Sequence, residues 1–166
     1  MSKQISPPSP QDFTMVGARF SRIQIDETAF FNAPTDGFSM AIGVHLPKVS
    51  DQKFGDRSVI EVTVTARVVP DDQAADVKLA NEMLLLECVA GFVGDRTQYD
   101  GDLERFAALS PFYCRSVYWM LRERLQSILS VTLFRHGEDL PWDLDKETIE
   151  GLERIPSKPS KKASRR

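Results

Sequence analysis

Apolar and polar residues alternate along four stretches of the chain. The alternation is strict from Phe38 to Leu46 and from Val59 to Val69, a pattern typical of strands that bury one face. It also runs from Val16 to Phe31, where a slip near Asp26-Glu27 indicates a bulge. A fourth run, from Leu79 to Val93, is apolar on both faces. We therefore predict four strands.

The segments between these runs are too short and irregular for crossover helices, so we expect an antiparallel sheet. A long helix follows, because Ser110-Pro111 combines a capping serine with a proline in the first turn. Its apolar stripe has the spacing of one helix face: Cys114, Val117, Tyr118, Leu121, Leu125 and Ile128. A weak second helix is expected from Leu144 to Arg154. The predicted fold class is α+β, a four-stranded antiparallel sheet with one long helix and a short C-terminal helix.

Both ends of the sequence are rich in proline and serine, which neither pack nor pair regularly. We expect residues 1–12 to form a flexible arm, residues 156–166 a flexible basic tail, and residues 13–155 one domain, as suits a chain of 166 residues. No apolar run reaches the roughly 18 residues of a membrane span, and Met1 leads into no apolar signal core. With only two cysteines, a disulfide scaffold is excluded. These features favour a cytoplasmic protein.

The fourth strand carries more apolar surface than one helix is expected to cover. One face holds Leu84, Leu86, Cys88, Ala90 and Phe92, and the other holds Met83, Leu85, Val89 and Val93. A sheet that is apolar on both faces needs two covering layers. Trp119 also lies on the polar side of the long helix, with Arg115 and Arg122. We expect self-association there, with cover by loops and the second helix as the alternative.

The net charge of -3 hides an asymmetry between the body and the tail. Six of the 21 basic residues lie in the last 13 residues, which hold no acid, so the body holds 15 basic residues against 24 acidic ones. Such a tail attracts an acidic surface or keeps the protein soluble. Because no aromatic residue interleaves its charges, a nucleic-acid partner is not expected.

Candidate catalytic and metal-binding chemistry is sparse. Neither His45 nor His136 has a cysteine or carboxylate at metal-ligand spacing, and Cys88 and Cys114 are single residues inside regular elements. The adjacent acids Asp26-Glu27 and Asp71-Asp72 would point to opposite faces of a strand. No glycine-rich phosphate loop or nucleophile elbow is present. We expect a protein without a cofactor or metal that is not an enzyme.

Three stretches carry a likeness to a known family. The first is Gly17-Ala18-Arg19-Phe20-Ser21-Arg22-Ile23-Gln24-Ile25 leading to Phe31-Asn32-Ala33-Pro34. The second is Glu61-Val62-Thr63-Val64-Thr65-Ala66, followed by Leu85-Leu86-Glu87-Cys88 and Gly91-Phe92. The third is Phe106-Ala107-Ala108-Leu109-Ser110-Pro111-Phe112-Tyr113-Cys114-Arg115. In order and spacing, from about Val16 to Leu144, they resemble the protein-export chaperone SecB family.

The resemblance implies a protomer of four antiparallel strands that carry a long helix, with two dimers meeting through their helices as a tetramer. Members of the family are ATP-independent holdases, which keep unfolded polypeptides from aggregating. Many deliver these clients to the translocation ATPase SecA, and some SecB-like proteins control a toxin–antitoxin pair. Unfolded polypeptide clients are therefore the partners that the resemblance implies.

The family binds clients along the second strand, the crossover loop that follows it and the second helix. By resemblance, this groove includes Met40, Ile42 and Val44 of the second strand and Leu144, Ile149 and Leu152 of the second helix. Phe54, in the expected loop from Ser50 to Arg57, is added because of its location. An open apolar groove binds unfolded chains with little sequence preference. Plain core packing is the alternative for the same residues.

For SecA docking, the family uses acidic residues on the outer face of the sheet. Glu27, Leu85 and Glu87 fall at matching positions, whereas Asn32 stands where the family has a further acid. The commonest members also end in an acidic tail, and this chain ends in a basic one. These departures bear on SecA docking more than on client binding.

Two other classes of function stay open at this point. The first is a small-ligand-binding or catalytic α+β domain, with His45 and Glu61 as the polar groups of a compact cavity. The second is an adaptor whose basic tail, from Pro156 to Arg166, contacts an acidic partner. A holdase differs from the first by an open apolar groove, and from the second by working without its tail.

Overall fold

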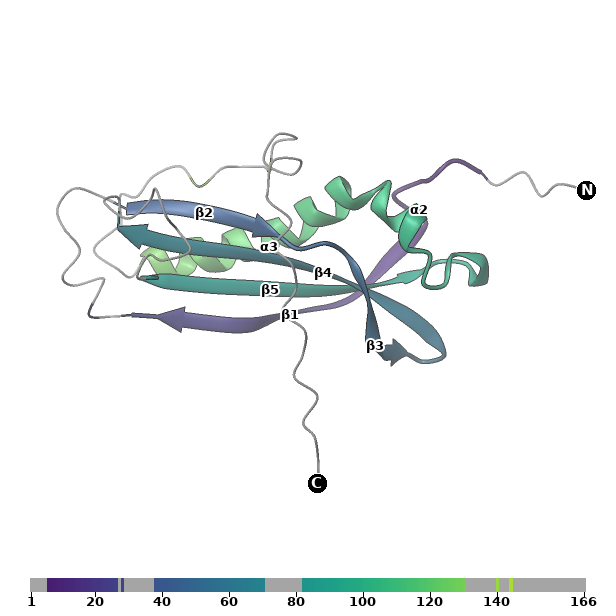
Figure 1. Cartoon of the computed structure of the whole chain (residues 1–166), viewed down its shortest axis with the longest axis horizontal. Helices are drawn as coiled ribbons and strands as arrows, with labels where there is room; N and C mark the ends of the chain where they lie inside the picture. The colour runs from purple at the N-terminus through teal and green to yellow at the C-terminus, as the bar shows by residue number, and fades with distance from the viewer. Residues whose placement is uncertain are drawn as a thin grey trace, which may run out of the picture.

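The structure is a computed structural model that describes residues 6–26, 28, 38–70, 82–130, 140 and 144. In these residues, one antiparallel sheet lies against one long helix (Figure 1). The strands are β1 Phe13–Ile25, β2 Phe38–Val44, β3 Lys48–Phe54, β4 Arg57–Pro70 and β5 Leu84–Gly94. The helices are η2 Thr97–Tyr99, α2 Leu103–Ala107 and α3 Ser110–Ser130. The predicted α+β class is confirmed.

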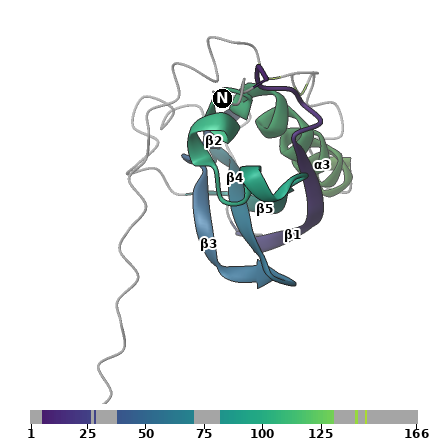
Figure 2. The ribbon, with the colours of Figure 1, turned by 90° about the vertical axis from the view of Figure 1, so that its right-hand side faces the viewer.

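The sheet has the strand order β1-β5-β4-β2, and β3 pairs with β4 on the same edge as β2. Every pairing is antiparallel, as predicted. β2 pairs with the C-terminal half of β4, from Phe38 opposite Pro70 to Val44 opposite Val64, and β3 pairs with its N-terminal part. Seen along the strands, β3, β4, β5 and β1 form a curved, half-open sheet (Figure 2).

The core lies between α3 and the two central strands, β4 and β5. On β4, Ile60, Val62, Val64, Ala66 and Val68 all have 0% exposure. α3 packs on β4 and β5 and buries the apolar stripe predicted for it. Apolar and polar residues alternate along β4 because one face of the strand packs against α3 and the other carries mostly polar residues.

An aromatic cluster and a buried ion pair close the core near α2. The rings of Phe106 and Tyr113 stack with 4.5 Å between centroids, and Phe13 meets Phe106 edge-on at 5.0 Å. Beside them, Arg105 Nε donates to Asp12 Oδ2 at 2.8 Å, and its other nitrogens donate to the carbonyls of Ser6 and Pro7. Residues 6–12 of the arm expected to be flexible therefore lie against the domain.

The structure corrects the strand prediction in two places. The expected loop from Ser50 to Arg57 is mostly strand β3, so the sheet has five strands instead of four. A two-residue turn joins β3 to β4, and Gly55 takes the left-handed φ of 60° that glycine tolerates. The register of β1 shifts between Met15 and Gly17 and between Phe20 and Arg22, where no bulge was expected. β1 ends at Ile25, and Glu27, beside the expected slip, lies outside the described residues.

The expectation that β5 needs a second chain to cover its outer face is also corrected. Leu85 and Val93, on the face away from α3, are buried within the single chain, and Val89 is half-buried. Met83 was expected on that face but belongs to the core cluster. The case for self-association therefore has to rest on other residues. The expected second helix, apart from Leu144, and the basic tail lie outside the described residues.

Candidate functional site

An apolar row on β1 is left open beside the buried core. Ile23 and Ile25 lie opposite Leu86 and Leu84 of β5, so they share the face of the sheet that carries α3. Together with Phe20, they are between 36% and 45% exposed, whereas their partners on β5 are buried. The difference arises because α3 packs mainly on β4 and β5. We call Phe20, Ile23 and Ile25 the β1 row.

α3 carries a second set of accessible apolar side chains. Trp119 is 50% exposed, as its predicted place on the polar side of the helix requires, and Met120 and Phe112 are also exposed. Arg115 Nε donates to the carbonyl of Leu144 at 3.2 Å. Arg122 was expected on the polar side, but its side chain is buried. Its Nη1 donates to Gln126 Oε1 at 3.4 Å, one turn further along the helix.

Strands β2 and β3 form one long edge of the sheet, which we call the β2–β3 edge. Met40, Ile42 and Val44 are half-buried and pack against the core cluster. This placement is compatible with both predictions for them, groove lining and core packing. Further along the edge, Leu46, Val49 and Phe54 are between 43% and 58% exposed. No other described strand pairs with the outer side of this edge. Among the described residues, β2 and β3 are therefore edge strands.

The remaining predicted client-binding residues do not extend the row formed by Met40, Ile42 and Val44. Leu144 is buried in the core cluster, and Ile149 and Leu152 lie outside the described residues. Phe54 comes from β3, not from a loop, and it lies on the opposite face of the sheet from Met40, Ile42 and Val44.

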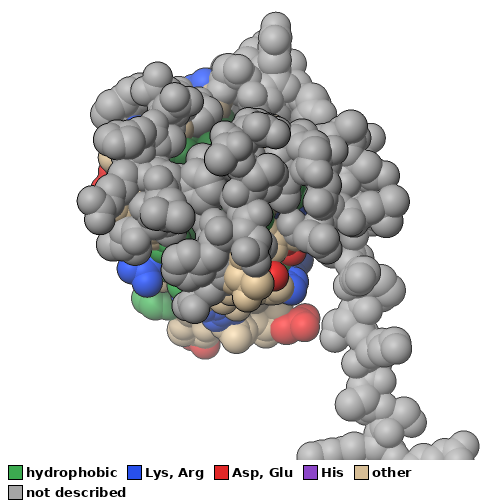
Figure 3. Space-filling model, turned by 90° about the vertical axis from the view of Figure 1, so that its left-hand side faces the viewer, with side chains coloured by type: hydrophobic (Ala, Val, Ile, Leu, Met, Phe, Trp, Pro, Cys, Tyr) green, Lys and Arg blue, Asp and Glu red, His purple; other side chains and the backbone are tan. Residues whose placement is uncertain are grey.

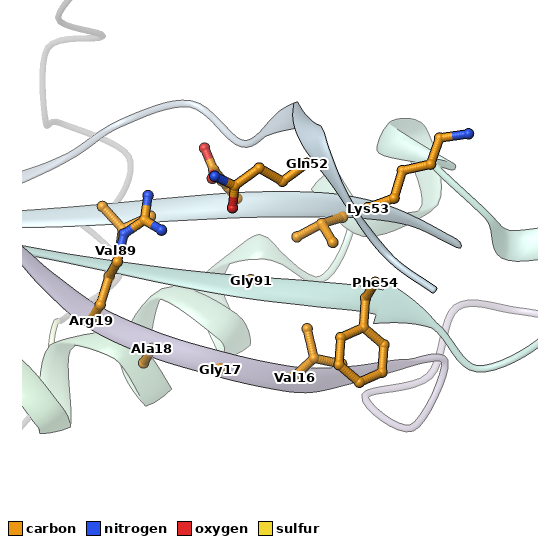
Figure 4. Close-up of a pocket in the computed structure, with 11 residues that line it drawn as sticks. Val16, Gly17, Ala18, Arg19, Gln52, Lys53, Phe54, Val89 and Gly91 are labelled. Carbon is orange, nitrogen blue, oxygen red and sulfur yellow. The ribbon is translucent and has the colours of Figure 1, made fainter. Parts of the chain in front are cut away.

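Phe54 borders a cleft of about 270 Å³ on the face of the sheet away from α3 (Figure 4). Its floor is made of β1 and β5, and β3 curls over it. The residues that line it include Val16, Gly17, Arg19, Phe54, Glu61 and Gly91. The cleft was not predicted, because it depends on β3, whose exposed polar residues show no alternation. The Gly55-Asp56 pair, a common two-residue hairpin turn, was the available signal.

The residues expected at a SecA-docking surface are placed as follows. Leu85 is buried, with 4% of its surface exposed, and Glu87 is half-buried. Glu87 accepts a hydrogen bond from Ser21 and lies opposite Arg22 on β1. Glu27 lies outside the described residues. Docking at these positions remains a prediction.

The groups considered for catalysis are engaged in structural contacts or stand apart. Glu61 pairs with Lys48 at 3.5 Å and accepts from Ser50, and His45 is not among the residues that line the cleft. Burial raises the pKa of both Cys88 and Cys114 to about 11, so neither thiol is ionised near neutral pH. Among the described residues, no three side chains of metal-binding type come together.

One end of the described surface carries side chains of both charges (Figure 3). At the end of the molecule shown in Figure 3, its hydrophobic, basic and acidic side chains are intermixed. Within the described ranges, no helix combines the length and apolar character that a membrane crossing needs.

The fold and these surfaces define a small α+β protein with one covered core and apolar side chains left accessible on β1, on α3 and along the β2–β3 edge. No family model matches the sequence, and no curated protein is similar to it. Among solved structures, it is similar to the Mycobacterium tuberculosis Rv1957 SecB-like chaperone in complex with a ChAD peptide from Rv1956 HigA1 antitoxin. The identity is 15%, the match covers 79% of this chain and 92% of that chain, and the TM-score is 0.43.

Proposed function

We propose that this protein is an ATP-independent holdase that binds unfolded polypeptide segments on accessible apolar surface. The observation that carries the proposal is the β2–β3 edge, where three apolar side chains are about half exposed on or beside strands that lie at the edge of the described sheet. Unfolded polypeptides present apolar side chains and unpaired backbone groups together. An edge strand with apolar neighbours binds both with little demand on sequence.

The proposal includes self-association into a homotetramer. The β1 row and Trp119 support it, since large apolar side chains left open on neighbouring elements are typical of protein–protein contacts. The clients are either proteins for export, delivered through SecA, or one dedicated polypeptide such as an antitoxin. The sequence resemblance to the SecB family is compatible with both roles.

The proposal is tested by light scattering from an aggregation-prone model protein as it refolds without ATP. We expect the full chain to suppress scattering at sub-stoichiometric amounts. The double variant Leu46→Ser with Val49→Ser should lose most of this activity, because it removes accessible apolar surface of the edge without opening the core. Leu103→Ser is the matched control, since Leu103 is an exposed leucine on α2, away from the edge.

The outcomes separate the proposal from its competitors. Failure of the unmodified chain to suppress aggregation in large molar excess rejects the holdase. Full activity of the double variant rejects the β2–β3 edge as its binding surface. Activity that disappears when residues 156–166 are removed favours the adaptor instead, because a holdase does not need the basic tail.

A further inference from the structure

The cleft beneath β3 is a candidate site of a different kind from the β2–β3 edge. We propose that it binds an extended polypeptide segment that places an apolar side chain against Val16 and Phe54 and a carboxylate on Arg19. This inference rests on the proposed function, because it names the class of segment that a second, selective site on the same protein takes. The residues involved lie on the face of the sheet away from α3.

The floor of the cleft is shaped for the close approach of a backbone. Gly17 and Gly91 lie opposite each other on β1 and β5, so neither strand contributes a side chain at this point. A Cβ added at Gly17 would meet no atom within 4 Å, so the space above it is open. Val16 and Phe54 stand together at one end of this floor and form an apolar wall (Figure 4).

The charges around the cleft give it a preference for acidic segments. Three charged residues line it: Arg19, Lys53 and Glu61. The carboxylate of Glu61 is already held by Lys48 and Ser50, and Figure 4 shows Lys53 pointing away from the floor. Arg19 is exposed, and none of the hydrogen bonds or ion pairs found among the described residues uses its side chain. The accessible charge at the cleft is therefore a guanidinium, which binds carboxylates well.

The two ends of the cleft set the spacing of the ligand. Arg19 and the pair of Val16 and Phe54 lie at opposite ends of the row in Figure 4. In an extended peptide, residues two positions apart point to the same side and lie about 7 Å from each other. A segment with an apolar residue two positions from an aspartate or glutamate thus presents both groups to the cleft. The basic tail of this chain has the wrong charge to be the occupant.

The test is fluorescence anisotropy with the full chain and a short peptide that carries a neutral dye and blocked ends. The peptide has one leucine and one aspartate two positions apart in a glycine–serine background. One control peptide replaces the aspartate with lysine, and another replaces the leucine with serine. We expect the first peptide to bind more tightly than either control, with an affinity that falls as salt is added.

Three variants and one control variant locate the binding. Arg19→Gln should weaken the acidic peptide by roughly fivefold, as expected for a partly exposed ion pair. Arg22→Gln is the matched control, because Arg22 is an exposed arginine of the same strand that lies outside the cleft and bonds Gln24. Gly17→Leu should abolish binding by filling the floor. Arg19→Glu should reverse the preference, so that the lysine peptide binds better than the aspartate peptide.

Each result decides between the site and its alternatives. Equal loss in Arg19→Gln and Arg22→Gln, or unchanged binding in Gly17→Leu, overturns the site. If the peptide fails to bind while the chain still suppresses aggregation, the cleft proposal fails and the holdase stands. If the peptide binds as expected while aggregation is not suppressed, the holdase fails and the cleft stands as an acidic-peptide site.

Discussion

Strands β1 and β5 are neighbours, and their paired apolar residues differ in burial. Ile23 pairs with Leu86 and Ile25 pairs with Leu84, so each pair points to the same face of the sheet. The members on β5 are buried, and those on β1 are about half exposed. Alternation therefore tells which face of a strand is apolar, but a second element decides whether that face is covered.

The difference in cover between β1 and β5 separates residues that stabilise the single chain from residues that are accessible to other polypeptides. α3 packs on β4 and β5, and the aromatic cluster closes one end of the same layer. Apolar residues under this cover stabilise the single chain through burial. Apolar residues beyond it contribute little to the single chain and stay accessible for other polypeptides. The same distinction applies to the β2–β3 edge.

The largest expected effect compares the two members of one cross-strand pair. Leu86→Ala should lower the free energy of unfolding by about 3–4 kcal/mol, because it leaves a cavity in the covered core. Ile23→Ala should cost less than about 1 kcal/mol in the monomer, because half of that side chain already meets water. Urea unfolding at low protein concentration measures both. Equal losses would show that the β1 row is covered after all.

A slightly smaller effect is expected where the N-terminal arm closes the core. Asp12→Asn should cost about 3 kcal/mol, since the buried Arg105 guanidinium loses its charged partner at 2.8 Å. Asp51→Asn, on the exposed strand β3, is the control and should change the free energy of unfolding by less than about 0.5 kcal/mol. A small effect at Asp12 would mean that residues 6–12 add little to the cover.

The β1 row and Trp119 of α3 are expected to form the contact between associated chains. Ile23→Glu or Trp119→Glu should weaken self-association about thirtyfold, as expected for the loss of a central apolar contact. Leu103→Glu changes an exposed leucine elsewhere and should leave association unchanged. Sedimentation velocity over a range of concentrations gives the mass of each variant. A monomeric unmodified chain at micromolar concentration removes the tetramer from the proposed function.

The parts of the fold that could be predicted are those that bury apolar residues in a regular pattern. Strands β2 and β4 and helix α3 have the period of an element with one buried face, and β5 has the continuous apolar run of a strand buried on both faces. β3 was missed since its residues are mostly exposed and polar, so no period marks it. η2 and α2 are too short to show a helical period.

The candidate site was harder to predict for a related reason. Its residues were chosen by resemblance along single elements, whereas accessibility depends on which elements lie over them. Leu85 and Leu144 are apolar residues that the fold buries, and Phe54 and the β1 row are apolar residues that it leaves open. Arg19 lies in the first of the three stretches that resemble the SecB family, and no other sequence signal marks it. It lines a cleft with a glycine floor only because β3 curls across the sheet.

The smallest expected effect tests how completely the covered core excludes water from the Cys88 thiol. Burial raises the pKa of the Cys88 thiol from its ordinary 9.0 to about 11. Above pH 9, the thiol ionises in the unfolded chain but not in the folded one, so the unfolded chain binds fewer protons. The free energy of unfolding must then fall as pH rises, by about 1 kcal/mol for this thiol between pH 9 and about pH 10.

The thiol contribution is isolated by comparing the unmodified chain with Cys88→Ala under reducing conditions. The stability advantage of the unmodified chain should shrink by that amount when urea unfolding is repeated at the higher pH. Cys114→Ala should behave in the same way, because the pKa of Cys114, on the buried face of α3, is also raised to about 11 by burial. An advantage that does not change with pH would mean that water reaches these thiols. β5 would then differ from β1 only in how much of its surface is covered, and α3 would shield the sheet from water less than its packing implies.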